Sequence, residues 1–199
     1  MRTIFQNCTL LDGTEQMTPR PGTDVAIEND RIAQIGKITP NKGDRVVDLT
    51  GKYLMPGLIN LHVHLPAGGK PQNKPMNTNR LTKIALSSGL SRALVLRMCH
   101  AYAMQGLLSG VTTVRVVGGL DNLDTRLRDL IHAGKLDGPR ILAANYAIGV
   151  PHGHMVGSVT RPAETVEDAV RMVDQLHGQN VDLIKLMITG GVMDAKVKG

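Results

Sequence analysis

The chain has 199 residues, and its 42% apolar and 20% charged residues are typical of a globular protein with one or two domains and a substantial core. It contains no run of about 18 apolar residues that could cross a membrane, and its N-terminus lacks the apolar core and cleavage site of a signal peptide. The formal charge of +6 comes from scattered basic residues with few aromatic neighbours, a pattern that argues against a nucleic-acid-binding module.

Residues 1–54 are predicted to form a small β module, which we expect to be a β-sandwich. The turn signal Asp12-Gly13 ends its first strand. Asn29-Asp30 joins the second and third strands, because both residues tolerate the positive φ of a tight hairpin. The predicted strands cover residues 3–11, 24–28, 31–36 and 46–49.

A further strand is predicted at residues 58–65, directly after Pro56-Gly57. Alternate side chains of a strand point to opposite faces, so Asn60, His62 and His64 share one face. Two imidazoles at this spacing can converge on one ion, with nitrogen–metal distances of about 2.0–2.1 Å. The alternative is that both are surface or hydrogen-bonded core histidines. Hydrophobic sequence on either side predicts that both faces of this strand are covered.

The segment between this strand and the next combines a loop with helical sequence. The Gly/Pro-rich residues 66–75 follow the histidines and are predicted to lie over their site, as a lid, as a wall of the substrate path or as a plain connector. Residues 81–108 are predicted to be helical, in two helices that meet near Ser88-Gly89. The second helix is apolar nearly all round, which predicts burial on more than one side.

The remaining residues alternate between strand and helix patterns. Thr165 and Asp168 have the spacing of a capping box at the start of the last helix, and Gly134 is a fitting stop for the preceding one. Repeated units of this length predict parallel strands with right-handed crossovers, and four units make half of a (β/α)8 barrel. The predicted strands cover residues 110–119, 139–148 and 181–188, and the helices cover residues 124–133 and 165–177.

Three further residues are candidates for a site at the strand ends. Lys185 lies between Ile184 and Leu186 in an apolar strand, and a buried lysine usually loses its proton because an unpaired buried charge is costly. The alternative is a lysine that extends to solvent or pairs with a carboxylate. His152 and His154 follow the third strand on the same rim, where they could bind substrate or face solvent.

Two segments carry a family resemblance. The run from Val47 to His64 resembles the start of the barrel in the amidohydrolase superfamily. Residues 184–191 resemble the fourth strand of its prolidase-like and imidazolonepropionase-like members. The resemblance implies that His62 and His64 bind a divalent metal, expected to be Zn²⁺. It also implies that Lys185 reacts with CO2 to give a carbamate that bridges two metals, and that His152 and His154 contact the substrate.

The sequence departs from the family pattern in three respects. Asn60 stands where the family often has aspartate, and Val116 follows Arg115 where many relatives have aspartate. The two histidines of strands five and six, and the catalytic aspartate of strand eight, have no counterpart. We therefore assign no catalytic residue within the chain and expect the catalytic aspartate to lie beyond Gly199, in a C-terminal half of the site.

These observations predict an α/β protein: the N-terminal part of a (β/α)8 TIM barrel, with about four β/α units at residues 55–199, preceded by the β-sandwich module at 1–54. The implied activity is hydrolysis of a small amide by a metal-bridging water, with a dipeptide carrying Pro, Arg or Lys at its C-terminal side as the favoured substrate. A cyclic amide or amidine is the alternative substrate. An inactive metal-binding or structural relative is the alternative of another class.

Partners and location follow from the same pattern. Half a barrel has open strand edges, so we expect a homo-oligomer or a complementary C-terminal half, with no nucleic acid and no membrane as partner. Cys8 and Cys99 are the only cysteines and are predicted to be free buried thiols. Such thiols are typical of a reducing compartment, and we expect a cytoplasmic protein.

Overall fold

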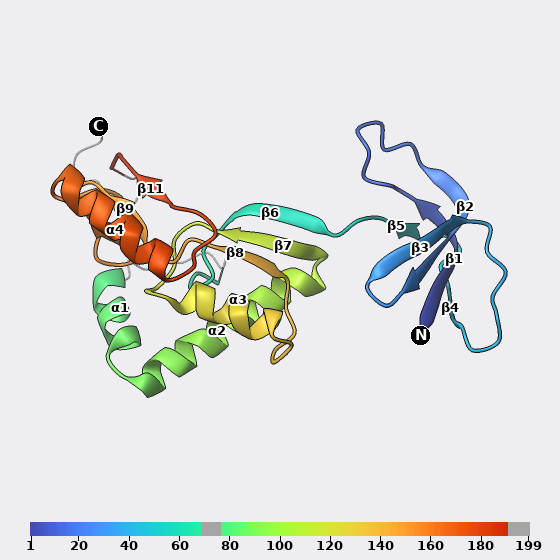
Figure 1. Ribbon diagram of the computed structural model, residues 1–199, viewed down its shortest axis with the longest axis horizontal. Helices are drawn as coiled ribbons and strands as arrows, with labels where there is room; N and C mark the ends of the chain where they lie inside the picture. Colours follow the sequence, from blue (N-terminus) through green and yellow to red (C-terminus); the bar gives the residue numbers. More distant parts are fainter. Residues whose placement is uncertain (69–76, 191–199) are drawn as a thin grey trace. The chain divides into compact units, whose positions relative to one another are not determined.

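The computed structural model describes residues 1–68 and 77–190, which form two compact units that divide after Gly57. The first unit is all β, and the second combines parallel strands with four helices (Figure 1). No helix in the described ranges is long and apolar enough to cross a membrane.

The first unit is a single five-stranded sheet with strand order β3-β2-β1-β4, in which β5 also pairs with β1. β2 is antiparallel to β1 and β3, whereas β4 and β5 are parallel to β1. The predicted β-sandwich is therefore not what the described residues form. The strands are β1 Arg2–Leu10, β2 Arg20–Glu28, β3 Arg31–Gly36, β4 Arg45–Asp48 and β5 Tyr53–Leu54.

A buried carboxylate organises this sheet. Asp24 lies on β2 and accepts hydrogen bonds from the backbone N–H groups of Asn7 and Ile38, both at 2.9 Å. These bonds lower the pKa of Asp24, the bond from Asn7 most strongly. Asn29 has a φ of 57°, which confirms the tight hairpin between β2 and β3.

The second unit contains two three-stranded parallel sheets, with strand orders β6-β7-β8 and β10-β9-β11. In Figure 1 the helices α2 and α3 lie beside the first sheet, and α4 lies beside the second. The strands are β6 Leu58–Val63, β7 Val111–Val116, β8 Arg140–Ala143, β9 Ala147–Gly149, β10 Thr160–Pro162 and β11 Leu186–Met187. The helices are α1 Thr78–Leu86, α2 Gly89–Leu108, α3 Leu123–His132 and α4 Val166–Gly178.

Local sequence explains where the helices begin and end. The break between α1 and α2 falls at Ser88, whose side chain caps α2, so two helices meet where predicted. Thr165 and Asp168 form the predicted capping box at the start of α4. Gly134 has a φ of 66° just after α3, as expected of a helix stop.

The predicted third strand is split in two. β8 ends at Ala143 and β9 begins at Ala147, because Asn145 between them has a φ of 58° that a strand does not permit. The Asn145 side chain is fully buried, and its Oδ1 accepts a hydrogen bond from the Thr125 N–H at the start of α3. The polar asparagine therefore ends one strand and ties it to a helix.

The predicted fourth strand shrinks to β11. Before it, Asp182 takes the place of a strand partner for β8: its N–H donates to the Ala143 carbonyl and its Oδ2 accepts from the Ala143 N–H, both at 2.8 Å. Arg128 on α3 donates to the same Oδ2 at 2.7 Å. A side chain thus replaces a ladder hydrogen bond, so regular pairing starts only at Leu186.

The main core of the second unit lies between β7, β8 and the helices α2 and α3. Cys99 belongs to it, and both Cys8 and Cys99 are free and buried, as predicted. Burial raises the pKa of the Cys99 thiol to about 12, so this thiol is unreactive. The central members of this core are Leu96, Ala103, Val114, Val116, Leu123, Leu127, Ile141 and Ala143.

Three burial predictions are wrong for this chain, the last of them in part. β6 is open, with Ile59 63% exposed, although both of its faces were expected to be covered. α2 buries only the stripe containing Leu96, Cys99 and Ala103. On α4, the periodicity predicts an inner stripe of Val166, Val170, Val173 and Leu176 or His177, and only part of it is confirmed. Val173 and Leu176 pack in the core together with Ala169 and Met172, whereas Val166 is 74% exposed and Val170 is also exposed.

Candidate metal centre

His62 and His64 come together at the end of β6. His62 is the fifth residue of that strand and His64 follows its last residue. Their Nε2 atoms are 3.3 Å apart, and the ring planes are inclined at 68°. Two nitrogens each about 2.05 Å from one tetrahedral ion are about 3.3 Å apart, so the pair fits two ligands of a single divalent ion.

The ring orientation of His64 is set by a backbone carbonyl. His64 Nδ1 lies 2.8 Å from the carbonyl oxygen of Gly118, which follows β7. A hydrogen bond at this distance places the proton on Nδ1 and leaves the lone pair on Nε2, the atom that faces His62. Gly118 has a φ of 140°, and a Cβ there would meet the His64 ring at 3.3 Å. Glycine is therefore the residue that this approach requires.

Positive charge surrounds His62. Burial lowers the pKa of His62, and nearby His64, Lys185 and Arg115 lower it further. A lowered pKa keeps the imidazole neutral near pH 7, the form in which it can bind a metal. Lys185 is therefore one of the groups whose charge influences His62.

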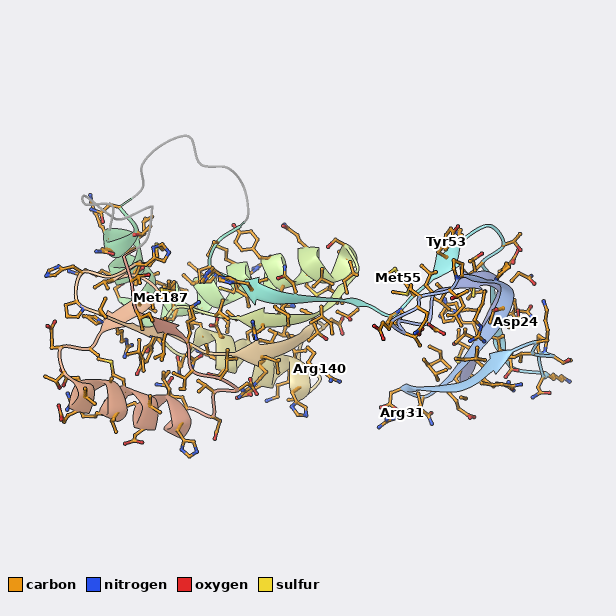
Figure 2. The ribbon with its side chains drawn as sticks, turned by 90° about the horizontal axis from the view of Figure 1, so that it is seen from above. Asp24, Arg31, Tyr53, Met55, Arg140 and Met187 are labelled. Carbon is orange, nitrogen blue, oxygen red and sulfur yellow. The ribbon has the colours of Figure 1, made fainter. Side chains whose placement is uncertain are left out.

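Lys185 is half-buried and immediately precedes β11, the strand that contains Met187 in Figure 2. Its carbonyl accepts a hydrogen bond from the Ile148 N–H at 2.9 Å, which anchors this segment beside β9. Within residues 1–68 and 77–190, no group of three or more histidine, cysteine, aspartate or glutamate side chains could hold a metal.

The two loop histidines follow β9. His152 has a φ of 59°, and the His154 N–H lies 3.4 Å from the carbonyl oxygen of Thr189, which comes two residues after β11. The loop thus reaches the end of the strand that follows Lys185. The predicted lid at 66–75 lies outside the described residues from position 69 onward.

The predicted position of the catalytic aspartate is not tested by the described residues. It was expected beyond Gly199, the last residue of the sequence, and its position therefore stays a prediction. The structure describes the chain up to residue 190, so Gly199 itself and the residues that lead to it also lie outside the described part. The described site contains candidate metal ligands and substrate contacts.

The two departures from the family pattern have different surroundings. Val116 is 0% exposed and packs in the hydrophobic core, so an aspartate at this position would be buried among apolar side chains. Asn60 Oδ1 accepts a hydrogen bond from the His62 N–H at 3.1 Å, a bond that an aspartate could equally accept. Sequence reasoning missed Gly118 as a partner of His64; its only signal was the glycine pair after the second barrel strand.

A family model described as the amidohydrolase family matches residues 53–199. The chain belongs to this family. A putative prolidase from Bifidobacterium longum has a similar structure, with a TM-score of 0.74 and 30% identity over 98% of this chain and 43% of that one. This likeness confirms the prolidase-like branch of the amidohydrolases and the mixed α/β fold of its barrel proteins.

Curated relatives of this amidohydrolase chain carry other names. A 5-methylthioadenosine/S-adenosylhomocysteine deaminase of Thermoanaerobacter pseudethanolicus is 44% identical over 66 residues, 33% of this chain and 15% of that protein. A dihydroorotase of Bacillus licheniformis is 31% identical over 78 residues, 39% of this chain and 18% of that protein. The chain spans less than half the length of the prolidase structure and matches a smaller share of these relatives.

Proposed function

We propose that this chain supplies part of the active site of a metal-dependent enzyme that hydrolyses a C–N bond in a small amide. The favoured substrate is a dipeptide with proline, arginine or lysine at its C-terminal side. The observation that carries the proposal is the 3.3 Å separation of His62 Nε2 and His64 Nε2. The charge of Lys185, which helps to lower the pKa of His62, adds to it. The likeness to a putative prolidase supports the choice of a dipeptide.

In this proposal His62 and His64 hold a divalent metal, with Zn²⁺ as the expected ion and two ions in a complete site. The metal supplies Lewis acidity toward the amide carbonyl. Gly118 keeps the Nε2 lone pair of His64 available, through the hydrogen bond at Nδ1. The remaining ligands and the proton-transferring aspartate come from a C-terminal half, either beyond Gly199 on the same polypeptide or on a partner chain.

Lys185 has a covalent role in this proposal. Its ammonium first releases one proton to solvent. The resulting neutral amine attacks the carbon of CO2, a new N–C bond forms as a C–O π bond breaks, and a second proton passes to solvent. The product is a carbamate anion, whose oxygens would serve as metal ligands. The conversion replaces a positive charge near His62 with a negative one, which favours cation binding.

His152 and His154 are the proposed substrate contacts. The His154 N–H of this loop approaches the carbonyl oxygen of Thr189. Thr189 comes two residues after β11, the strand that Lys185 immediately precedes. A protonated or hydrogen-bonding imidazole there can bind the substrate carboxylate or the carbonyl oxygen. Loss of either histidine is expected to raise KM for dipeptides.

The deaminase and dihydroorotase names of the curated relatives favour the second candidate, hydrolysis of a cyclic amide or amidine. An enzyme assay separates the candidates. The full-length polypeptide, or this chain combined with its C-terminal half, is loaded with Zn²⁺ and bicarbonate. It is then incubated with Xaa-Pro, Xaa-Arg and Xaa-Lys dipeptides, with dihydroorotate and with adenine nucleosides. Hydrolysis of dipeptides supports the proposal, and hydrolysis of the cyclic compounds alone supports the second candidate.

Metal analysis tests the third candidate, an inactive relative. The purified protein should contain divalent metal that is lost in the His62→Asn variant. Metal binding without hydrolysis of any compound in the panel would contradict the proposed activity and leave a metal-binding relative. Failure of the wild-type protein to bind metal would overturn the candidate metal centre itself.

A further inference from the structure

The pairing of β6 with β7 is irregular at His62. Asn60 is paired with Val114 and Val63 with Val116, so two residues of β6, Leu61 and His62, stand opposite the single residue Arg115. One extra residue on one strand is a β-bulge, which bends the strand and changes the direction of its side chains. An irregularity of the opposite sense lies near Leu58, so the overall register is restored across the pair.

Two side chains hold the backbone of this bulge. Arg115 Nε donates a hydrogen bond to the Leu61 carbonyl oxygen at 2.7 Å. Asn60 Oδ1 accepts a hydrogen bond from the His62 N–H at 3.1 Å. Both contacts lie at exposed positions, so each favours the bulged geometry by the net value of an ordinary hydrogen bond, about 0.5–1.5 kcal/mol. Asn60 comes directly before the bulge on β6, and Arg115 lies opposite the bulge on β7.

The two contacts hold the peptide unit between Leu61 and His62, from which the His62 side chain projects. The Leu61–His62 peptide contributes both the carbonyl that Arg115 binds and the N–H that Asn60 binds. The His62 ring faces His64, whose own ring is fixed separately by the Gly118 carbonyl. The aim of His62 toward His64 therefore depends on the backbone geometry of the bulge.

We propose that Arg115 and Asn60 are positioning residues that clamp the Leu61–His62 peptide and thereby set the direction of His62 Nε2 for metal binding. Arg115 is engaged through Nε with a backbone oxygen, so its role is to orient a ligand. This inference rests on the proposed metal centre. It adds two residues that carry no ligand atom, one of them at a position where the sequence already departs from the family.

The test measures metal affinity and coordination, with no need for substrate. The apoprotein is titrated with Co²⁺, whose visible absorption reports ligand geometry, and Zn²⁺ affinity is obtained by competition. Arg115→Met and Asn60→Leu remove the hydrogen-bonding groups and should weaken Zn²⁺ binding by about 10- to 100-fold. Both should also change the Co²⁺ spectrum. Arg115→Lys and Asn60→Asp keep a donor and an acceptor and should restore affinity to within about 3-fold.

Arg140→Met is the matched control, because Arg140 begins β8 and its side chain is exposed (Figure 2). It should leave affinity and spectrum unchanged. If Arg115→Met does not fold, as judged by circular dichroism, Asn60→Leu carries the test. Unchanged affinity and spectrum in the folded variants would overturn the inference. Equal absence of binding in wild type and in His62→Asn would instead overturn the proposed metal centre.

Discussion

The carbonyl oxygen of Gly118 lies 2.8 Å from His64 Nδ1, and this contact joins the end of β7 to the histidine that follows β6. It selects the tautomer in which His64 Nε2 carries the lone pair. The backbone of one strand thereby determines which ring atom of its neighbour can bind a metal.

Gly118→Ala should weaken Zn²⁺ binding by about 10-fold or more, because the new Cβ meets the His64 ring at 3.3 Å and the φ of 140° is strained for alanine. A competition titration against a chelator measures the effect. Gly134→Ala is the matched control: its φ is also positive, at 66°, but nothing lies within 4 Å of the added Cβ. It should lower stability and leave metal affinity unchanged, and equal affinities in the two variants would contradict this role of Gly118.

Asp124 should make stability fall as pH rises. Its side chain is 1% exposed, neither oxygen has a hydrogen-bond partner in the described part of the chain, and burial raises its pKa from 3.8 to about 7. Between these two pH values the folded chain holds a proton that the unfolded chain has released. Stability from this group is therefore present below about pH 4 and lost as pH rises to 7, with a total cost of about 4 kcal/mol.

Asp124→Asn should remove this dependence, so that the variant gains stability over wild type at pH 8 and not at pH 4. Urea unfolding at several pH values measures the difference. Asp174→Asn, at an exposed position of α4, is the control and should leave the pH profile as in wild type. If the unfolding free energies of Asp124→Asn and wild type changed with pH in the same way, the prediction would be contradicted. The carboxyl would then have the same pKa in the folded and unfolded chain.

Asp182→Ala should destabilise the fold by about 1–3 kcal/mol, because the Ala143 N–H and the Arg128 guanidinium both lose an acceptor. Asp182→Asn keeps one side-chain oxygen and should lose less. Chemical unfolding followed by circular dichroism gives both values. Equal stability of Asp182→Ala and wild type would mean that water replaces the carboxylate at both sites.

Incubation with ¹³C-labelled bicarbonate and Zn²⁺ should produce a carbamate carbon signal in the NMR spectrum. The signal should be absent in Lys185→Met and present in Lys83→Met, which removes an exposed lysine of α1. A signal that persists in Lys185→Met would assign the carbamate to another amine. Its absence in metal-loaded wild type would leave Lys185 unmodified.

Much of the second unit could be predicted because its signals are local. The capping residues Ser88 and Thr165 fix where helices start, and the two-residue spacing of His62 and His64 brings their rings together at the end of β6. What could not be predicted depends on distant partners. Asn145 ends a strand where its side chain accepts a hydrogen bond from the Thr125 N–H. The Asp182 carboxylate replaces a ladder hydrogen bond because the Ala143 N–H lies opposite it.

The first unit shows the same limit. Alternating strands such as β2 and β3 were predicted from local pattern, but the number of layers depends on what covers each face. On α4, Val166 and Val170 have the periodicity of a buried stripe, yet the neighbouring Ala169 and Met172 form the packed side. The direction in which a helix faces is fixed by tertiary packing, which periodicity alone does not specify.

β6 carries His62 and, in the described residues, pairs with β7 alone. Its other edge is open to a further strand. A strand that docked there would lie beside the residue whose ring faces His64. If docking of a strand and binding of a metal favour the same geometry of His62, linkage requires each to strengthen the other by one common factor.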